Sequence, residues 1–120
     1  MEKTVLLVED DLALRDILQD ILEEEGYDVV PAADGRQALE YLRTTSGRDE
    51  APALMILDLM MPLVSGWEVL DAMEADPRLQ VPVIVVSADG TKPEDISTGT
   101  VFLHKPFNLE ELLETVHERC

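Results

Sequence analysis

Short apolar runs alternate along the whole chain with segments of helical periodicity. Five runs are rich in the aliphatic and β-branched residues that favour strands, and they cover residues 4–8, 27–30, 53–57, 81–86 and 100–104. The first run is continuously apolar after its threonine, which is typical of a parallel strand buried on both faces. Strands that alternate with helices predict a parallel sheet covered by helices on both faces. We therefore expect one doubly wound α/β domain over residues 1–120.

Four of the segments between and after these runs carry the start and stop signals of helices. In the first helix, apolar residues recur at spacings of three and four, and Gly26 is expected to end it. Capping pairs predict where the other three helices begin. These pairs are Asp34 with Gln37, Ser65 with Glu68, and Asn108 with Glu111. The apolar helix positions are Leu14, Ile17, Leu18, Ile21 and Leu22; Ala38, Leu39 and Leu42; Val69, Leu70 and Met73; and Leu109, Leu112, Leu113 and Val116.

The connection before the last strand differs from the others. Residues 88–99 contain two glycines, one proline and only Ile96 as an apolar anchor. Their number is close to the shortest connection that can join two parallel strands, about 10–12 residues. We therefore expect a shortened or irregular fourth helix in this segment.

The charge balance excludes several classes of partner. The net formal charge is −17, from 26 acidic and 9 basic residues. Nucleic-acid surfaces need clustered lysine and arginine, so we expect no direct contact with nucleic acid and none with an anionic membrane.

The N-terminus has no signal-peptide pattern, and no apolar segment approaches the roughly 20 residues that span a bilayer. A single cysteine, Cys120, precludes a disulfide within the chain, and we expect a cytoplasmic protein.

Polar residues follow four of the five predicted strands. Residues 9–11 (Glu-Asp-Asp) follow the first strand, Asp58 the third, Ser87 the fourth and Lys105 the fifth. Each has an ordinary explanation by itself: helix capping, a turn, a strand-end hydroxyl and a surface lysine. In open parallel sheets, however, ligands bind at the carboxyl ends of the strands, where the strand order reverses. The joint occurrence of these residues at successive strand ends therefore favours a single site.

The residue types in this set suit phosphoryl transfer. Clustered carboxylates repel one another and favour a divalent cation, and ligands that are all oxygen suit Mg²⁺. A carboxylate beside Mg²⁺ can attack phosphorus and form an aspartyl phosphate, while a lysine and a hydroxyl stabilise the oxygens of the phosphoryl group during its transfer. Asp58 ends an apolar strand, where an ionised carboxylate needs such partners. We predict that Asp58 is the phosphoryl acceptor.

The motifs around these residues resemble the receiver domain of two-component response regulators, the family of the chemotaxis receiver protein. They are "LLVEDD" (6–11), "ILDLMMPLVSGWEVL" (56–70), "VPVIVVSA" (81–88) and "LHKPF" (103–107). The resemblance covers essentially the whole chain. It implies a flavodoxin-like sheet with strand order 2-1-3-4-5 and a single receiver domain over residues 1–120.

The resemblance also implies a metal site that contains Mg²⁺. Asp58 is then the phosphorylated aspartate and, together with Asp10, a direct ligand of the metal. Glu9 acts through a metal-bound water, and the backbone carbonyl of Met60 is the remaining metal ligand that the protein supplies. We expect Asp11, which matches no family position of this kind, to cap the following helix.

Three further positions carry roles that the resemblance implies. Ser87 supplies the hydroxyl that moves toward the phosphoryl group on activation. Lys105 contacts the phosphoryl oxygens, and the peptide bond between Lys105 and Pro106 is expected to be cis. Phe102 occupies the aromatic switch position and is also expected in the core. We interpret His104 and His117 as ordinary strand and helix residues.

The implied function is a phosphorylation-dependent switch that catalyses its own Mg²⁺-dependent phosphoryl uptake and loss. The implied partners are a histidine kinase or a histidine phosphotransfer protein, and an unidentified downstream protein. No output domain follows the last helix, which favours a stand-alone receiver over a receiver excised from a larger protein.

Three other classes share parts of this pattern. An aspartyl phosphohydrolase of the haloacid-dehalogenase class needs a second acid two residues after Asp58, where this chain has Met60. A flavodoxin-like cofactor binder needs a phosphate loop after the first strand, where residues 9–11 would repel a phosphate. A pseudo-receiver, which shares the fold but is not phosphorylated, is the remaining alternative.

Overall fold

The strands form one parallel sheet whose order confirms the predicted fold class. The computed structural model describes residues 3–59, 61, 64–87, 100–105 and 108–120. The strands within these residues are β1 (Thr4–Val8), β2 (Asp28–Ala32), β3 (Leu54–Asp58), β4 (Val83–Ser87) and β5 (Val101–His104). Their order in the sheet is β2-β1-β3-β4-β5, and neighbouring strands are parallel.

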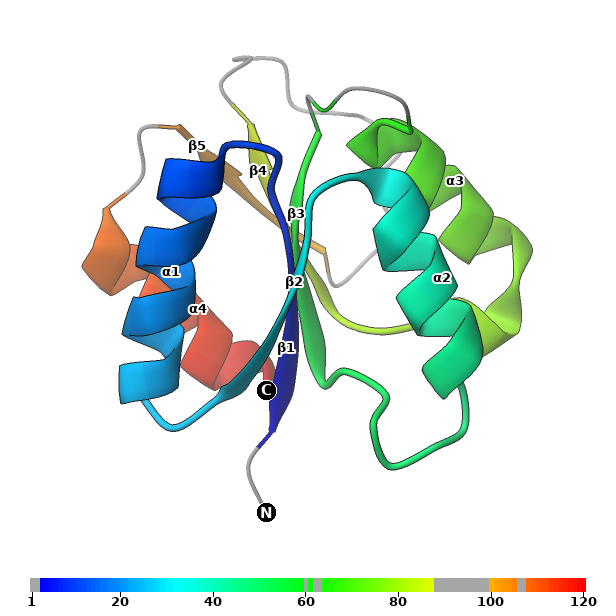
Figure 1. The fold of residues 1–120 in the computed structure, drawn as a ribbon, viewed down its shortest axis with the longest axis horizontal. Helices are drawn as coiled ribbons and strands as arrows, with labels where there is room; N and C mark the ends of the chain where they lie inside the picture. The colour runs from blue at the N-terminus through cyan, green and yellow to red at the C-terminus, as the bar shows by residue number, and fades with distance from the viewer. Residues whose placement is uncertain (1–2, 60, 62–63, 88–99, 106–107) are drawn as a thin grey trace.

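Helices cover both faces of this sheet. They are α1 (Leu12–Glu24), α2 (Gly35–Thr45), α3 (Gly66–Ala75) and α4 (Leu109–Arg119), with a 3₁₀ turn, η1, at Pro77–Leu79. Figure 1 shows α1 and α4 on one face and α2 and α3 on the other. The predicted irregular helix in residues 88–99 lies outside the described residues, so α4 here is the last helix of the chain. Within the described residues, no helix combines the length and the apolar character needed to cross a membrane.

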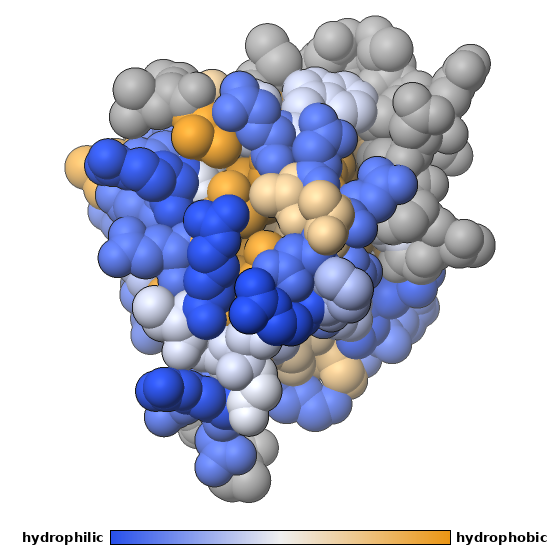
Figure 2. Space-filling view, turned by 90° about the vertical axis from the view of Figure 1, so that its right-hand side faces the viewer, coloured by the Kyte–Doolittle hydropathy of each residue, from blue (hydrophilic) through white to orange (hydrophobic). Residues whose placement is uncertain are grey.

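The central strands contribute to two hydrophobic cores, one on each side of the sheet. In β1, Leu6 and Val8 pack into the cluster beneath α2 and α3, whereas Val5 and Leu7 pack into the cluster beneath α1 and α4. Burial on both faces explains why this strand is continuously apolar in the sequence. The face of the molecule on the side of α2 and α3 is mainly hydrophilic, with scattered hydrophobic side chains among the hydrophilic ones (Figure 2).

The predicted end of α1 at Gly26 is confirmed by its backbone geometry. Gly26 has a φ of +96°, and its N–H donates to the carbonyl of Glu23 at 3.1 Å. The N–H of Tyr27 donates to the carbonyl of Leu22 at 3.2 Å. These two bonds form a Schellman motif, in which the residue at the glycine position must be left-handed.

Side-chain caps begin the helices where the sequence predicts them. Asp34 accepts a hydrogen bond from the N–H of Gln37, and Ser65 accepts one from the N–H of Glu68. Asn108 caps α4 through the N–H of Glu110. In α1 the cap is Asp11, as expected, which accepts from the N–H groups of Ala13 and Leu14. Of the three acids at residues 9–11, Asp11 is therefore the one that caps the helix.

Two strand boundaries differ from the prediction by two residues, and each of these differences involves a proline. Strand β2 was expected at residues 27–30 but continues through Pro31 to Ala32, because β2 is an edge strand and needs no N–H on its outer side. Strand β4 was expected from residue 81 but begins at Val83. It lies between β3 and β5, where Pro82 could not donate to the ladder.

Replacing Gly26 with alanine should lower the free energy of unfolding by about 1 kcal/mol, because an L residue resists a left-handed backbone. No atom lies within 4 Å of the position that the new Cβ would take, so crowding adds nothing to this cost. Asparagine tolerates the same conformation better, and Gly26→Asn should therefore lose less stability. Urea unfolding of the three proteins measures the difference, and equal stability of the alanine variant and the wild type would contradict it.

Candidate functional site

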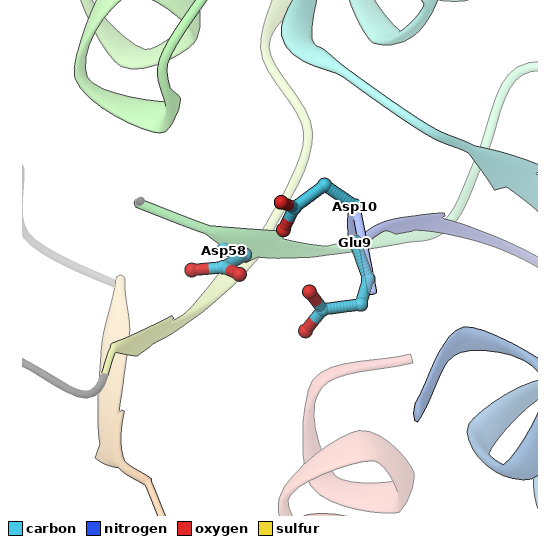
Figure 3. Close-up of side chains that lie close together, drawn as sticks. All are labelled: Glu9, Asp10 and Asp58. Carbon is cyan, nitrogen blue, oxygen red and sulfur yellow. The ribbon is translucent and has the colours of Figure 1, made fainter. Parts of the chain in front are cut away.

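The strand register brings three acids together at the carboxyl ends of β1 and β3. Val8 pairs with Leu57, so the residues that follow them, Glu9 and Asp58, emerge side by side. Glu9 and Asp10 extend from the end of β1 toward Asp58 at the end of β3 (Figure 3). A carboxylate oxygen from each of the three residues lies within 4.8 Å of the others.

Ser87 and Lys105 lie at the same edge of the sheet. Asp58 pairs with Val86, so Ser87 is one residue further along the neighbouring strand, and it is fully buried. The carbonyl of Ser87 accepts a hydrogen bond of 2.8 Å from the backbone N–H of Lys105. The four strand ends that carry polar residues in the sequence therefore meet at one place, as predicted.

The ammonium of Lys105 connects two buried carboxylates. Its Nζ donates to Oε1 of Glu9 at 2.8 Å and to Oδ2 of Asp58 at 3.1 Å. Glu9 is 2% exposed and Asp58 is 3% exposed, so neither carboxylate has much contact with water. Burial alone would lower the pKa of Lys105, but the hydrogen bonds to Glu9 and Asp58 outweigh it and raise this pKa above its usual value. Lys105 is therefore the counter-charge of the site.

Glu9 has a pKa raised to about 7, mainly because burial disfavours its charged form. The hydrogen bond from Lys105 acts in the opposite direction, and the neighbouring carboxylate of Asp58 adds to the increase. The N–H of Asp11, which donates to Oε2 of Glu9, partly offsets the effect of burial. Glu9 thus holds a proton more readily than an exposed glutamate does.

The donor set at this edge fits a divalent cation. Three carboxylates face one ammonium, so the side chains of Glu9, Asp10, Asp58 and Lys105 carry an excess of negative charge when all are ionised. Oxygen ligands of this kind suit Mg²⁺, and the exposed side chain of Asp10 leaves the site open to solvent. Met60, the fourth predicted contributor, lies outside the described residues, as does the predicted cis bond to Pro106.

Gly66, to which the sequence assigned no role, packs directly against the backbone of Asp58 and Leu59. Its N–H donates to the carbonyl of Leu59 at 3.1 Å. A Cβ on Gly66 would lie 2.6 Å from the Cα of Leu59 and closer still to the carbonyl oxygen of Asp58. The only available signal was a glycine directly after the predicted helix cap Ser65, a position where helices do not need one.

Arg15 is a second contributor without a predicted role. Its Nη1 donates to the backbone carbonyl of Glu9 at 3.0 Å. The sequence offered only an arginine on the first turns of the helix after the acidic triplet, and such residues are usually exposed to solvent. The bond joins α1 to the end of β1.

Phe102 and the two histidines make ring contacts with other side chains. Phe102 is partly buried against the core beneath α2 and α3, and its ring meets that of His104 edge-on at 4.9 Å. His117 lies on α4, and its Nδ1 is 2.6 Å from the hydroxyl of Tyr27, the residue before β2.

The sequence matches the family model of the response regulator receiver domain over residues 5–117. The chain belongs to this family. Its members are signalling modules of two-component systems, and phosphorylation together with Mg²⁺ binding at an acidic pocket is a general feature of them. Response regulators interact with histidine kinases, and the predicted family is confirmed.

Individual relatives agree with this assignment. The transcriptional regulatory protein CpxR of Escherichia coli K12 is 36% identical over 116 residues, which cover 93% of this chain and 47% of the relative. SphR of Synechococcus elongatus, a regulator of alkaline phosphatase synthesis, is 35% identical over 91% of this chain and 45% of its own length. The receiver domain thus spans about half the length of the curated relatives it matches.

Solved receiver structures share the fold over nearly the whole chain. A response regulator receiver protein from Pseudomonas putida is 32% identical, with a TM-score of 0.83 and coverage of 98% of both chains. The response regulator TrrA of Thermotoga maritima, solved in complex with Mg²⁺ and BeF, is 30% identical, with a TM-score of 0.82. That match covers 98% of this chain and 99% of TrrA.

The raised pKa of Glu9 predicts a pH dependence of stability in metal-free protein. Between about pH 4.5 and about pH 7 the folded state holds a proton on Glu9 that the unfolded state has released. The stabilising contribution of the protonated group is therefore complete below this range and is lost as pH rises through it. Urea unfolding in the presence of a chelator should show the wild type losing stability relative to Glu9→Gln across this range. A stability difference that stays constant or grows with pH would contradict the prediction.

Replacing Gly66 with alanine should lower the free energy of unfolding by about 1–3 kcal/mol, because the Cβ would collide with main-chain atoms of Asp58 and Leu59. Helix propensity acts in the opposite direction, since alanine in a helix is favoured over glycine by about 1 kcal/mol. The sign of the change in urea unfolding therefore separates the two effects. A more stable alanine variant would show that the main chain at Asp58 and Leu59 can move away from the new Cβ without loss of stability.

Proposed function

We propose that this receiver domain accepts a phosphoryl group on Asp58 from a histidine kinase or a histidine phosphotransfer protein. The modification uses Mg²⁺ and alters the binding of a downstream protein partner. The proposed domain extends over residues 1–120, and a cytoplasmic location, which is typical of the family, belongs to the same proposal. The observation that carries it is the convergence of Glu9, Asp10 and Asp58 at one edge of the sheet, with Lys105 bridging two of them.

Glu9, Asp10 and Asp58 are the proposed residues of the metal site, with the backbone carbonyl of Met60 as a further predicted ligand. Asp10 and Asp58 contact the ion directly in this proposal, and Glu9 acts through water. When bound there, Mg²⁺ supplies positive charge that neutralises the acids and the phosphoryl oxygens. The excess of carboxylates over ammonium groups supports a divalent cation at this position.

Asp58 acts as the nucleophile in the proposed reaction. A carboxylate oxygen of Asp58 attacks the phosphorus of a phosphohistidine, and the new O–P bond forms as the P–N bond to the donor breaks. The bonding electrons remain on the imidazole nitrogen that leaves. The product is an acyl phosphate on Asp58. Lys105, whose Nζ is 3.1 Å from Oδ2 of Asp58, is close enough to contact an oxygen of the attached group.

Ser87 and Phe102 are the proposed link from the phosphoryl group to the surface. Phosphorylation adds about −1.5 to −2 charge and strong acceptor oxygens, to which the hydroxyl of Ser87 can donate. Phe102 lies on β5 opposite Val85 and is only partly buried, which leaves its side chain room to change position. Coupling between these two residues would shift the equilibrium between two conformations of the surface formed by β4 and β5. Most of the segment that joins them, residues 88–99, lies outside the described residues.

Intact mass spectrometry after incubation with Mg²⁺ and a small-molecule phosphodonor tests this function. The wild type should gain one phosphoryl unit, and Asp58→Asn or added chelator should abolish the gain. Asp11→Asn is the matched control, because it removes an acid of the same triplet that caps α1 and should still be modified.

Two results would contradict the proposal. Modification of Asp58→Asn to the same extent as the wild type would place the phosphoryl group on another residue. No gain of mass in the wild type, under conditions where another receiver domain is modified, would favour the pseudo-receiver alternative, in which the fold signals by binding alone.

A further inference from the structure

Arg15 holds a main-chain group of the turn that joins β1 to α1. Its Nη1 donates to the carbonyl of Glu9 at 3.0 Å, and its backbone N–H donates to the carbonyl of Asp11 at 2.9 Å. The side chain is partly buried, so its guanidinium is held in place between the helix and the strand end. Arg15 therefore contacts the turn on both sides of Asp10.

The carbonyl that Arg15 contacts belongs to the peptide unit between Glu9 and Asp10. A peptide unit is planar, so fixing its carbonyl also fixes the direction of the N–H of Asp10. The peptide unit after Asp10 is held as well, because the N–H of Asp11 donates to Oε2 of Glu9 at 3.2 Å. Hydrogen bonds thus restrain the backbone on each side of Asp10.

Asp10 needs this restraint more than the other two acids do. Glu9 and Asp58 are buried and bonded to Lys105, whereas the side chain of Asp10 is exposed to solvent. An exposed side chain gains little orientation from packing. Its direction toward the other carboxylates is therefore set mainly by the backbone from which it extends.

We propose that Arg15 is a positioning residue for the cation site, which orients Asp10 by holding the peptide unit between Glu9 and Asp10. This inference rests on the proposed function, in which Asp10 is a direct ligand of Mg²⁺. Groups that orient metal ligands without touching the metal commonly change metal affinity by about 10–100-fold when they are removed.

Charge alone predicts the opposite effect. Arg15 is a cation near a site that is proposed to bind a cation, so its removal would strengthen Mg²⁺ binding if electrostatic repulsion dominated. If Arg15 acts by orienting Asp10, its removal weakens binding in spite of the lost repulsion. The sign of the change in affinity therefore separates the two explanations.

The test is the dissociation constant for Mg²⁺ in the wild type, Arg15→Met, Arg15→Lys and Arg43→Met, measured by titration of backbone amide resonances in NMR spectra. Arg15→Met keeps much of the side-chain volume without the charge or the donor, and binding should weaken by about tenfold. Arg15→Lys keeps one donor group and should lie between the wild type and the methionine variant. Arg43→Met makes the same change in net charge from an exposed position on α2 and should leave the affinity unchanged.

The spectra of the metal-free proteins give a second readout. The amide resonance of Asp10 should move in Arg15→Met, since its N–H shares a peptide unit with the carbonyl that loses its hydrogen bond. Urea unfolding without metal shows how much stability each variant has lost. If Arg15→Met does not fold, Arg15→Gln replaces it and is judged by the same criterion.

Unchanged or tighter binding of Mg²⁺ by Arg15→Met would overturn the inference, as would equal weakening in Arg43→Met or binding by Arg15→Lys as weak as that of the methionine variant. A wild type that binds no Mg²⁺ would instead contradict the proposed function. The two failures are therefore distinguishable.

Discussion

The repulsion between acids at the strand ends is the constraint on which the site depends. Glu9 and Asp58 are almost completely buried, and two ionised carboxylates in such surroundings are costly unless opposite charge is close. Lys105 supplies that charge to both. It still leaves the acids in excess, and this residual negative charge is what suits the edge of the sheet to a divalent cation.

The fold supplies the geometry that makes this arrangement possible. A parallel sheet directs all its carboxyl ends to one edge, and the order β2-β1-β3-β4-β5 puts β1 and β3 next to each other there. The apolar cores on both faces hold the strands rigidly, so the acids are carried on fixed positions rather than on long loops. The close packing of Gly66 against the backbone of Leu59 extends this rigidity past the end of β3.

The sequence predicted the sheet and the meeting of the strand ends because both follow from local patterns. Alternating apolar runs indicate the strands, and polar residues at their ends must meet once the strands are parallel. The end of β2 and the start of β4 were predicted wrongly, because a strand tolerates a proline such as Pro31 or Pro82 only if it lies at the edge of the sheet, and the sequence does not show directly which strand that is. The contacts of Gly66 and Arg15 could not be predicted, because both are made with main-chain atoms, which are the same in every residue.

The bridge between Glu9 and Lys105 joins residues separated by 96 positions in the chain, from the first strand to just beyond the last. A chain that had assembled only the first four strands would bring Glu9 and Asp58 together without their ammonium. Such a partial sheet is electrostatically penalised, so the site discourages intermediates that lack the C-terminal part. The charges proposed to serve signalling thereby also favour cooperative folding, in which the sheet forms completely or not at all.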